Sequence, residues 1–336
     1  MSNDCAMSTQ LQARNPGRTE VDLGGSFLDG FCTPFLLAAQ NADGGWGYRY
    51  GARSSVEVTS WVLLALRHCV KSEGLESAAE SGFSWLERAQ LRDGSWPAFI
   101  GQLHGCWATG LACMALHKRR GTTEGLARGL RWICGTWSAE GGFWRRLGYR
   151  LQRDHGVVRQ DSSLRGWSWT PGTASWVEPT ACSLIALRNT PQELHPRSAA
   201  KRRRLGEHML YDRMCPGGGW NSGNPLVYGV AGEPRVGPTV WALVALQDYR
   251  ERQENRMSLD WLERVYGDIR GPGSLALAHL CLETYDRPSP PPEPAFRRLY
   301  CNNQFFHNVL AIAWSAIALS LSADRRNVAS DGRNIS

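Results

Sequence analysis

The sequence contains one seven-residue phrase twice, fifty residues apart. Gln40–Trp46 and Gln90–Trp96 both read Gln-x-x-x-Gly-x-Trp, and each follows a segment with the apolar spacing of a helix. A unit of this length can bury its apolar face only against neighbouring units, so the number of copies determines the fold. Two weaker copies are present: Met214–Trp220 lacks the Gln, and Trp137–Phe143 lacks both the Gln and the Trp.

An apolar segment that ends in Ala-Leu, or in a variant of this pair, occurs six times along the chain. These segments are apolar nearly all round, which is typical of helices buried on every side. They are Val58–Leu66, Thr109–Leu116, Pro179–Leu187, Pro238–Leu246, Leu275–Leu282 and Ala313–Leu319. The segments between them are amphipathic and carry charge at helical spacing; they are Phe27–Gln40, Glu76–Gln90, Leu126–Trp137, Ala199–Met214, Leu259–Ile269 and a short piece around Pro294–Tyr300. Six pairs of an outer and an inner helix predict an all-α fold, a single (α/α)6 barrel.

We expect residues 23–322 to form the barrel as one domain. A basic, Trp-bearing insertion at about 144–175 interrupts it before the third inner helix. Long loops in compact domains are usually functional or disordered. The polar segments 1–22 and 323–336 are predicted to be disordered.

Composition limits the classes of partner and the compartment. The net charge of +7 comes from clusters such as Lys118–Arg120 and Lys201–Arg204, beside predicted helix ends, where cations interact favourably with the helix dipole. The same charge leaves open a peripheral contact with an anionic membrane or a substrate phosphate, whereas no basic motif for nucleic acid is present. Ten cysteines without a Cys-x-x-Cys pair favour reduced thiols and a cytoplasmic protein. Neither a signal peptide nor a membrane-spanning run is predicted.

The repeated phrase has a structural role by its chemistry, since Gly permits a tight turn, Gln can satisfy backbone groups and the indole covers both. The phrase resembles the QW motif of the prenyltransferase and squalene oxidase repeat superfamily. That superfamily includes squalene–hopene and oxidosqualene cyclases, β-domains of class II diterpene cyclases and protein prenyltransferase β subunits. The resemblance covers residues 25–322 and implies an isoprenoid small molecule as the ligand.

The class II cyclases of this superfamily protonate an alkene with the middle Asp of an Asp-x-Asp-Asp-Thr-Ala phrase. The matching phrase here is Trp176–Ala181, in which Glu178 supplies the one carboxyl group at the catalytic position. An acid of this kind must stay protonated, which burial in an apolar cavity favours by raising its pKa. The resemblance therefore implies Glu178 as the catalytic general acid. The alternative is that Glu178 stabilises a helix N-terminus, because Glu57 has the same register in the first inner helix.

Other branches of related folds fit the sequence less well. A zinc-dependent prenyltransferase needs an Asp-x-Cys pair and a distant His; His307 matches that His, but Arg235 and Gly237 replace the pair, so we expect no metal. A carbohydrate-active barrel could use Glu57 and Glu178 as two carboxylates at one rim. A thioester barrel is excluded because no Cys-Gly-Glu-Gln phrase occurs.

Aromatic residues complete the predicted site. Four tryptophans fall near the starts of inner helices, and with Glu57 and His307 they are the candidate substrate-binding residues; they are Trp61, Trp107, Trp176 and Trp241. Each indole face can stabilise a cation by roughly 0.5–2 kcal/mol, as a carbocation cascade requires. The sequence thus favours an atypical class II terpene cyclase-like enzyme that cyclises an isoprenoid chain by protonation, without a cofactor. The alternative is a non-catalytic isoprenoid- or peptide-binding barrel. Because squalene-type cyclases pair two barrels, a second barrel on a separate chain is a further candidate partner.

Overall fold

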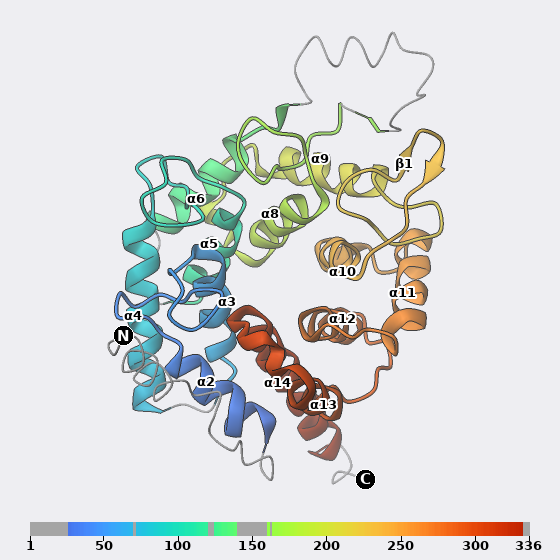
Figure 1. Ribbon diagram of the computed structural model, residues 1–336. Helices are drawn as coiled ribbons and strands as arrows, with labels where there is room; N and C mark the ends of the chain where they lie inside the picture. The colour runs from blue at the N-terminus through green and yellow to red at the C-terminus, as the bar shows by residue number, and fades with distance from the viewer. Residues whose placement is uncertain (1–25, 70–71, 120–123, 140–159, 162, 332–336) are drawn as a thin grey trace, which may run out of the picture.

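A computed structural model describes residues 26–69, 72–119, 124–139, 160–161 and 163–331 of the 336-residue chain. Six helices form an inner ring, in which each packs on the next and the last packs back on the first (Figure 1). They are α3 (Val56–Leu66), α5 (Ala108–His117), α8 (Val177–Asn189), α10 (Val236–Ala245), α12 (Pro272–Thr284) and α14 (Val309–Asp331). This arrangement confirms the predicted (α/α)6 barrel.

A second layer of helices surrounds the ring. It consists of α2 (Thr33–Ala38) with the preceding turn η2 (Leu28–Cys32), α4 (Glu73–Ala89), α6 (Glu124–Gly135), α9 (Ala199–Asp212), α11 (Gln253–Tyr266) and α13 (Glu293–Asn303). Short turns η4 (Gln192–Leu194), η5 (Gln247–Tyr249) and η6 (Gln304–His307) complete the connections. The strands β1 (Leu226–Val227) and β2 (Val230–Ala231) form an antiparallel hairpin in the loop before α10, with Val227 opposite Val230.

The burial of the helices follows their apolar patterns. Every residue of α5 from Ala108 to Leu116 is buried, because this helix is enclosed by its two ring neighbours and by α6. The outer helix α4 buries only one face, which includes Leu75, Phe83 and Leu86. The inner layer therefore supplies the core, and the outer layer separates it from water.

Each repeated phrase closes the turn between an outer and an inner helix. The Trp46 indole donates from Nε1 to the carbonyl oxygen of Leu36 at 2.7 Å. Trp96 and Trp220 likewise donate to the carbonyl oxygen of the residue ten positions upstream. Gln40 Nε2 donates to the carbonyls of Gly44 and of Ala78 on the next outer helix, both at 2.8 Å. Gln90 repeats this pattern with Gly94 and Gly125. The phrase thus joins successive outer helices.

The glycine of the phrase is required by its backbone conformation. Gly44, Gly94 and Gly218 have φ angles of +92°, +90° and +92°, in the left-handed region that side chains disfavour. At Gly94 a methyl group would also lie 2.8 Å from the backbone of Arg128.

The third copy of the phrase differs from the sequence-based prediction. We expected Phe143 to replace the tryptophan there, but Gly141 and Phe143 lie outside the described residues. Trp167 makes the expected bond instead, from its Nε1 to the carbonyl oxygen of Ile133 at 2.8 Å. The insertion therefore lies between the outer helix and the indole that caps it, and the chain returns to the repeat at Gly166–Trp167.

A threonine of the inner helix completes each of these four turns. The hydroxyl of Thr59 accepts from the backbone N–H of Trp46 at 2.9 Å and donates to its carbonyl. The other three pairs repeat this contact at 2.9–3.0 Å; they are Thr109 with Trp96, Thr180 with Trp167, and Thr239 with Trp220. The inner helix is thereby fixed to the phrase that precedes it.

Backbone contacts between repeats close the ring. The residue two positions after a phrase tryptophan accepts a hydrogen bond from the start of the preceding inner helix, as in Val56 N–H to Ala98 O and Val177 N–H to Ser222 O, both at 3.0 Å. The last contact of this kind runs from Val309 N–H on α14 to Tyr48 O in the first repeat. The N-termini of these inner helices therefore lie at one end of the barrel, which we call the turn face.

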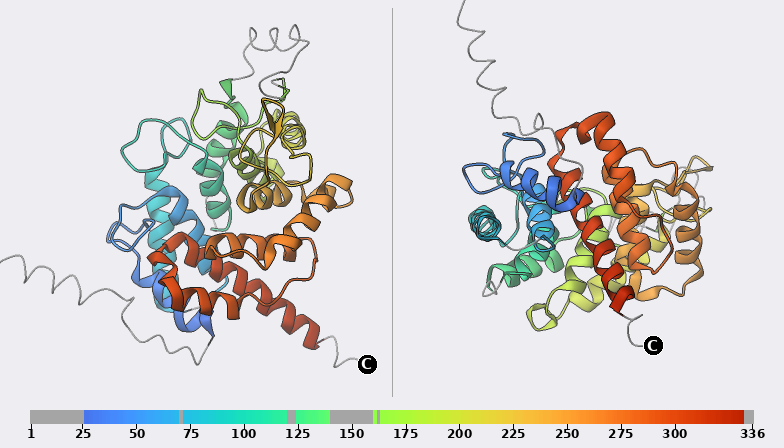
Figure 2. Two further views of the ribbon diagram at one scale, coloured as in Figure 1. Left: turned by 45° about the vertical axis from the view of Figure 1, so that its right-hand side comes forward. Right: turned by 90° about the horizontal axis from the view of Figure 1, so that it is seen from below.

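The last inner helix is longer than the sequence predicts. The helix α14 continues to Asp331 and projects from the ring, shown in red in Figure 2, so it extends into the segment 323–336 for which we expected no structure. Residues 1–22, 332–336 and most of the insertion lie outside the described residues. No helix in the described part of the chain is long and apolar enough to cross a membrane.

The threonine contacts predict the effect of Thr109→Val. Valine keeps the shape of threonine but leaves the buried Trp96 N–H without an acceptor, so we expect a loss of about 1–3 kcal/mol in the free energy of unfolding. Chemical denaturation measures this loss. Thr173→Val is the matched control, since the Thr173 hydroxyl is exposed and bonds only within its own turn. Equal effects of the two substitutions would contradict the assigned role.

Candidate functional site

A cavity of about 420 Å³ lies on the barrel axis, within the roughly 300–1,000 Å³ typical of small-molecule sites. All six inner helices contribute to its wall. The lining is mostly apolar and comprises Trp61, Leu64, Met114, Ile185, Val240, Trp241, Val244, Leu277, Leu280 and Ile317, with the polar residues Arg67, His68, Lys118, Asn189 and Thr284.

Helical spacing explains which residues face the axis. Glu57, Trp61 and Leu64 follow at intervals of four and three residues, which places them on one side of α3, and His68 lies four residues further on in the turn after the helix. On α8 the same spacing aligns Glu178 with Ile185 and Asn189. The two carboxylates therefore lie at the turn face, whereas the cavity begins near the middle of α3 and α10 and extends to the C-terminal ends of α3, α5, α8 and α12.

A layer of indoles lies between these two regions. Trp61 meets Trp241 edge-on, with ring centroids 5.8 Å apart, and it meets Trp314 at the same distance. Trp107 contacts Trp241 at 6.4 Å. Because Trp61 lies one turn after Glu57 on α3, this layer forms the floor of the cavity on the side of the carboxylates. The Nε1 atoms of Trp61 and Trp314 are buried without a hydrogen-bond partner among the described residues.

Glu178 is a partly buried carboxylate at the start of α8. Its Oε1 accepts from the Ser222 hydroxyl at 2.9 Å, and its Oε2 is buried without a hydrogen-bond partner in the described part of the chain. Burial raises the pKa of Glu178, against the effects of its own backbone N–H and of Ser222. The contact with its own N–H is typical of a residue that stabilises a helix N-terminus, and the unpartnered oxygen is typical of an acid held neutral. Glu178 does not line the cavity.

Glu57 has a similar setting in the first repeat. The Tyr48 hydroxyl donates to its Oε2, and burial raises the pKa of the Glu57 carboxyl. The two acids thus share a register and an environment, but each is held by the turn of a different repeat: Tyr48 belongs to the first and Ser222 to the fourth.

The remaining candidates divide between the cavity and the turn face. Trp61 and Trp241 line the cavity, as their positions on α3 and α10 suggested. Trp107 packs edge-on against Trp169 at 4.9 Å, and Trp176 lies against Gly223 in the neighbouring turn. His307 ends η6 just before α14 and does not line the cavity. Within the described residues, no group of three His, Cys, Asp or Glu side chains could hold a metal ion.

The polar end of the cavity was not among the residues predicted from the sequence. Arg67, His68 and Lys118 lie at its rim, at the C-terminal ends of α3 and α5. Lys118 belongs to a cluster that we assigned to helix-end charge. The signal in the sequence was the spacing from Trp61 through Leu64 to His68, which continues the axial face beyond the last apolar residue.

No family model matches the chain. Among solved structures, a protein from Actinoplanes superposes with a TM-score of 0.55 at 15% identity, covering 87% of this chain and 97% of its own. An α-1,6-mannanase of Salegentibacter, in complex with α-1,6-mannotriose, gives 0.54 at 12% identity, with 87% and 98% covered. These two similarities support the barrel fold alone. The type II terpene cyclase MstE from Scytonema, in complex with geranylgeranyl dihydroxybenzoate, gives 0.37 at 14% identity, with 87% and 95% covered, which is too low to support an argument.

The setting of Glu178 predicts a pH-dependent effect of Glu178→Gln. Because burial raises the pKa of this carboxyl, its charged form opposes folding at neutral pH. Removing the charge should raise Tm by roughly 1–3 °C at pH 7. The gain should shrink as the pH falls through the raised pKa of the folded state, and it should vanish below the ordinary pKa of a Glu, about 4, where the wild-type side chain becomes neutral in both states. Differential scanning calorimetry at several pH values tests this, with the exposed Glu233→Gln as control. A gain that is constant from pH 4 to 7 would contradict the explanation.

Proposed function

We propose that the central cavity binds an isoprenoid chain. The observation that carries the proposal is the apolar wall built from six helices above a floor of Trp61 and Trp241. A chain that leaves water for such a cavity gains about 0.8 kcal/mol for each buried CH₂ group. The resemblance of the repeated phrase to the QW motif supports an isoprenoid over other apolar chains.

Protonation-initiated cyclisation is a second candidate function. It is favoured by the buried Oε2 of Glu178, which has no partner among the described residues and could hold a proton because burial raises the pKa of this carboxyl. In this mechanism Glu178 donates its proton to a terminal alkene, and the indoles stabilise the resulting carbocation. The layer of Trp61 and Trp241 stands between the acid and the cavity, so the alkene must pass it to reach Glu178. Binding therefore needs only the cavity, whereas catalysis also needs the alkene to reach Glu178.

Glycoside hydrolysis is not proposed, although two carboxylates lie at the turn face. A sugar needs hydrogen-bonding partners for its hydroxyl groups, and the cavity presents few polar side chains away from its rim. Peripheral membrane contact, a second barrel on a separate chain and a cytoplasmic location stay predictions from the sequence.

Binding can be tested by filling the cavity from one wall. Ile185 lines the cavity on α8, so Ile185→Phe should occupy ligand space while disturbing few core contacts. We expect the affinity for geranylgeraniol, measured by titration calorimetry, to fall at least about tenfold, or about 1.4 kcal/mol. Ile185→Leu keeps the volume and should bind as the wild type does. If the wild-type protein binds neither geranylgeraniol nor squalene, the proposal is wrong.

Catalysis is tested separately by product analysis. Wild-type protein and Glu178→Gln are incubated with geranylgeranyl diphosphate and with squalene, and extracts are examined by mass spectrometry. A general acid predicts cyclic product from the wild type and a loss of at least about 10²-fold in the variant. Glu57→Gln, the matched carboxylate in α3, should retain activity. Binding without product from either substrate would favour the non-catalytic barrel.

A further inference from the structure

The open end of the cavity carries cations at the rim of a mostly apolar wall. Arg67 ends α3 and Lys118 ends α5, and both are exposed residues of the cavity rim together with His68. Arg67 follows Trp61 by six residues, so the rim lies about 9 Å along the helix axis from the indole floor. The cavity therefore has an apolar interior and a basic mouth.

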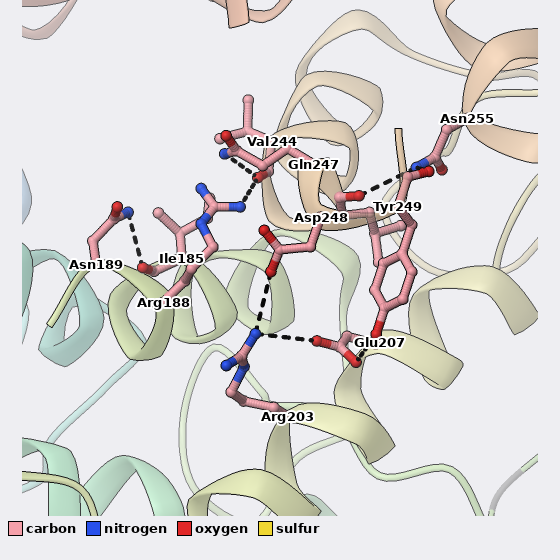
Figure 3. A network of polar contacts seen from close by, with 11 residues as sticks. Ile185, Arg188, Asn189, Arg203, Glu207, Val244, Gln247, Asp248, Tyr249 and Asn255 are labelled. Atoms are coloured by element: carbon pink, nitrogen blue, oxygen red, sulfur yellow. Dashed lines mark hydrogen bonds and ion pairs between the residues drawn. The ribbon is translucent and has the colours of Figure 1, made fainter. Parts of the chain in front are cut away.

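Two arginines on the neighbouring helices α8 and α9 belong to a polar network within the protein, as Figure 3 shows. Arg203 on α9 lies 3.3 Å from Asp248 and 3.7 Å from Glu207, and the Tyr249 hydroxyl donates to Glu207 at 2.8 Å. Arg188 on α8 donates to the carbonyl oxygen of Val244 at 3.0 Å. Both of these arginines have an acceptor within the protein.

Arg67 and Lys118 differ from these two arginines. Neither forms an ion pair within the part of the chain that the structure describes, and no side-chain hydrogen bond of either is found there. The two cations also repel each other. Partial burial lowers the pKa of Lys118, and the positive charge of Arg67 lowers it further. Two cations that repel each other at the mouth of an apolar cavity form a site that an anion would stabilise.

We propose that Arg67 and Lys118, beside His68, bind the phosphate or diphosphate head group of the amphiphile whose chain fills the cavity. This inference rests on the proposed function and adds the class and the orientation of the ligand. The chain enters with its apolar end toward Trp61 and Trp241, and the head group stays at the C-terminal ends of α3 and α5. Arginine suits this role because its planar fork matches phosphate oxygens.

The test compares three probes by titration calorimetry: geranylgeranyl diphosphate, geranylgeraniol and inorganic diphosphate. In the wild type we expect the lipid diphosphate to bind at least about tenfold more tightly than the alcohol, with an advantage that shrinks as salt is added. Arg67→Gln combined with Lys118→Gln should abolish this advantage and leave the affinity for the alcohol unchanged. Arg67→Lys combined with Lys118→Arg should retain it. Lys201→Gln combined with Arg204→Gln removes two exposed charges from α9 and serves as the matched control.

The outcomes separate this inference from the proposed function. Equal affinity of the wild type for the lipid diphosphate and the alcohol overturns the head-group site but leaves chain binding intact. The head-group site is also overturned if the Gln variant loses both ligands equally, or if the α9 control loses the advantage too. If inorganic diphosphate binds as tightly as the lipid does and only the Gln variant loses it, the anion site is supported and chain binding is wrong. Failure of all three probes contradicts both.

Discussion

The hydrogen bonds between each phrase tryptophan and the threonine of its inner helix hold the barrel together. A tight turn between two packed helices leaves backbone groups that water cannot reach, and each needs a partner. Thr59 and its three equivalents satisfy both backbone groups of a tryptophan, whose indole satisfies the end of the outer helix. The threonine thereby connects the inner helix to the turn, and the tryptophan connects the turn to the outer helix. The ring of axial side chains, and with it the cavity, depends on this link.

The sequence predicts the barrel well because the repeat is local. Inner helices are apolar all round, and the spacing between phrase and helix stays fixed in the first two copies. Trp167 was missed because the insertion separates it from Ile133, so the ten-residue spacing that marks the other copies is lost. The site was predicted only in part, since Trp61 and Trp241 face the axis, whereas Trp176 precedes its helix and lies against a neighbouring turn. Which side of each inner helix faces the barrel axis depends on tertiary packing, and no single segment of the sequence specifies it.

The cavity is chemically asymmetric along the barrel axis. Carboxylates with raised pKa values lie beyond the indole floor at the turn face, and basic side chains surround the opposite mouth. Helix dipoles favour this distribution, because acids suit the N-termini of the inner helices and cations their C-termini. The scaffold itself therefore assigns one sign of charge to each end. An amphiphile bound here has its polar and apolar ends distinguished before any specific contact is made.

The hydrogen bond from Val309 to Tyr48 joins the last inner helix to the first turn. During synthesis the N-terminal repeats emerge first, whereas a domain generally folds as a unit. The α14 flank of α3 can be covered only after nearly the whole chain has left the ribosome. Closure of the ring is thus a contact between distant parts of the sequence, which folds slowly and leaves apolar surface open until it forms. Until α14 packs between α12 and α3, the ring is an open arc, and the faces of α3 and α12 that α14 covers have no partner.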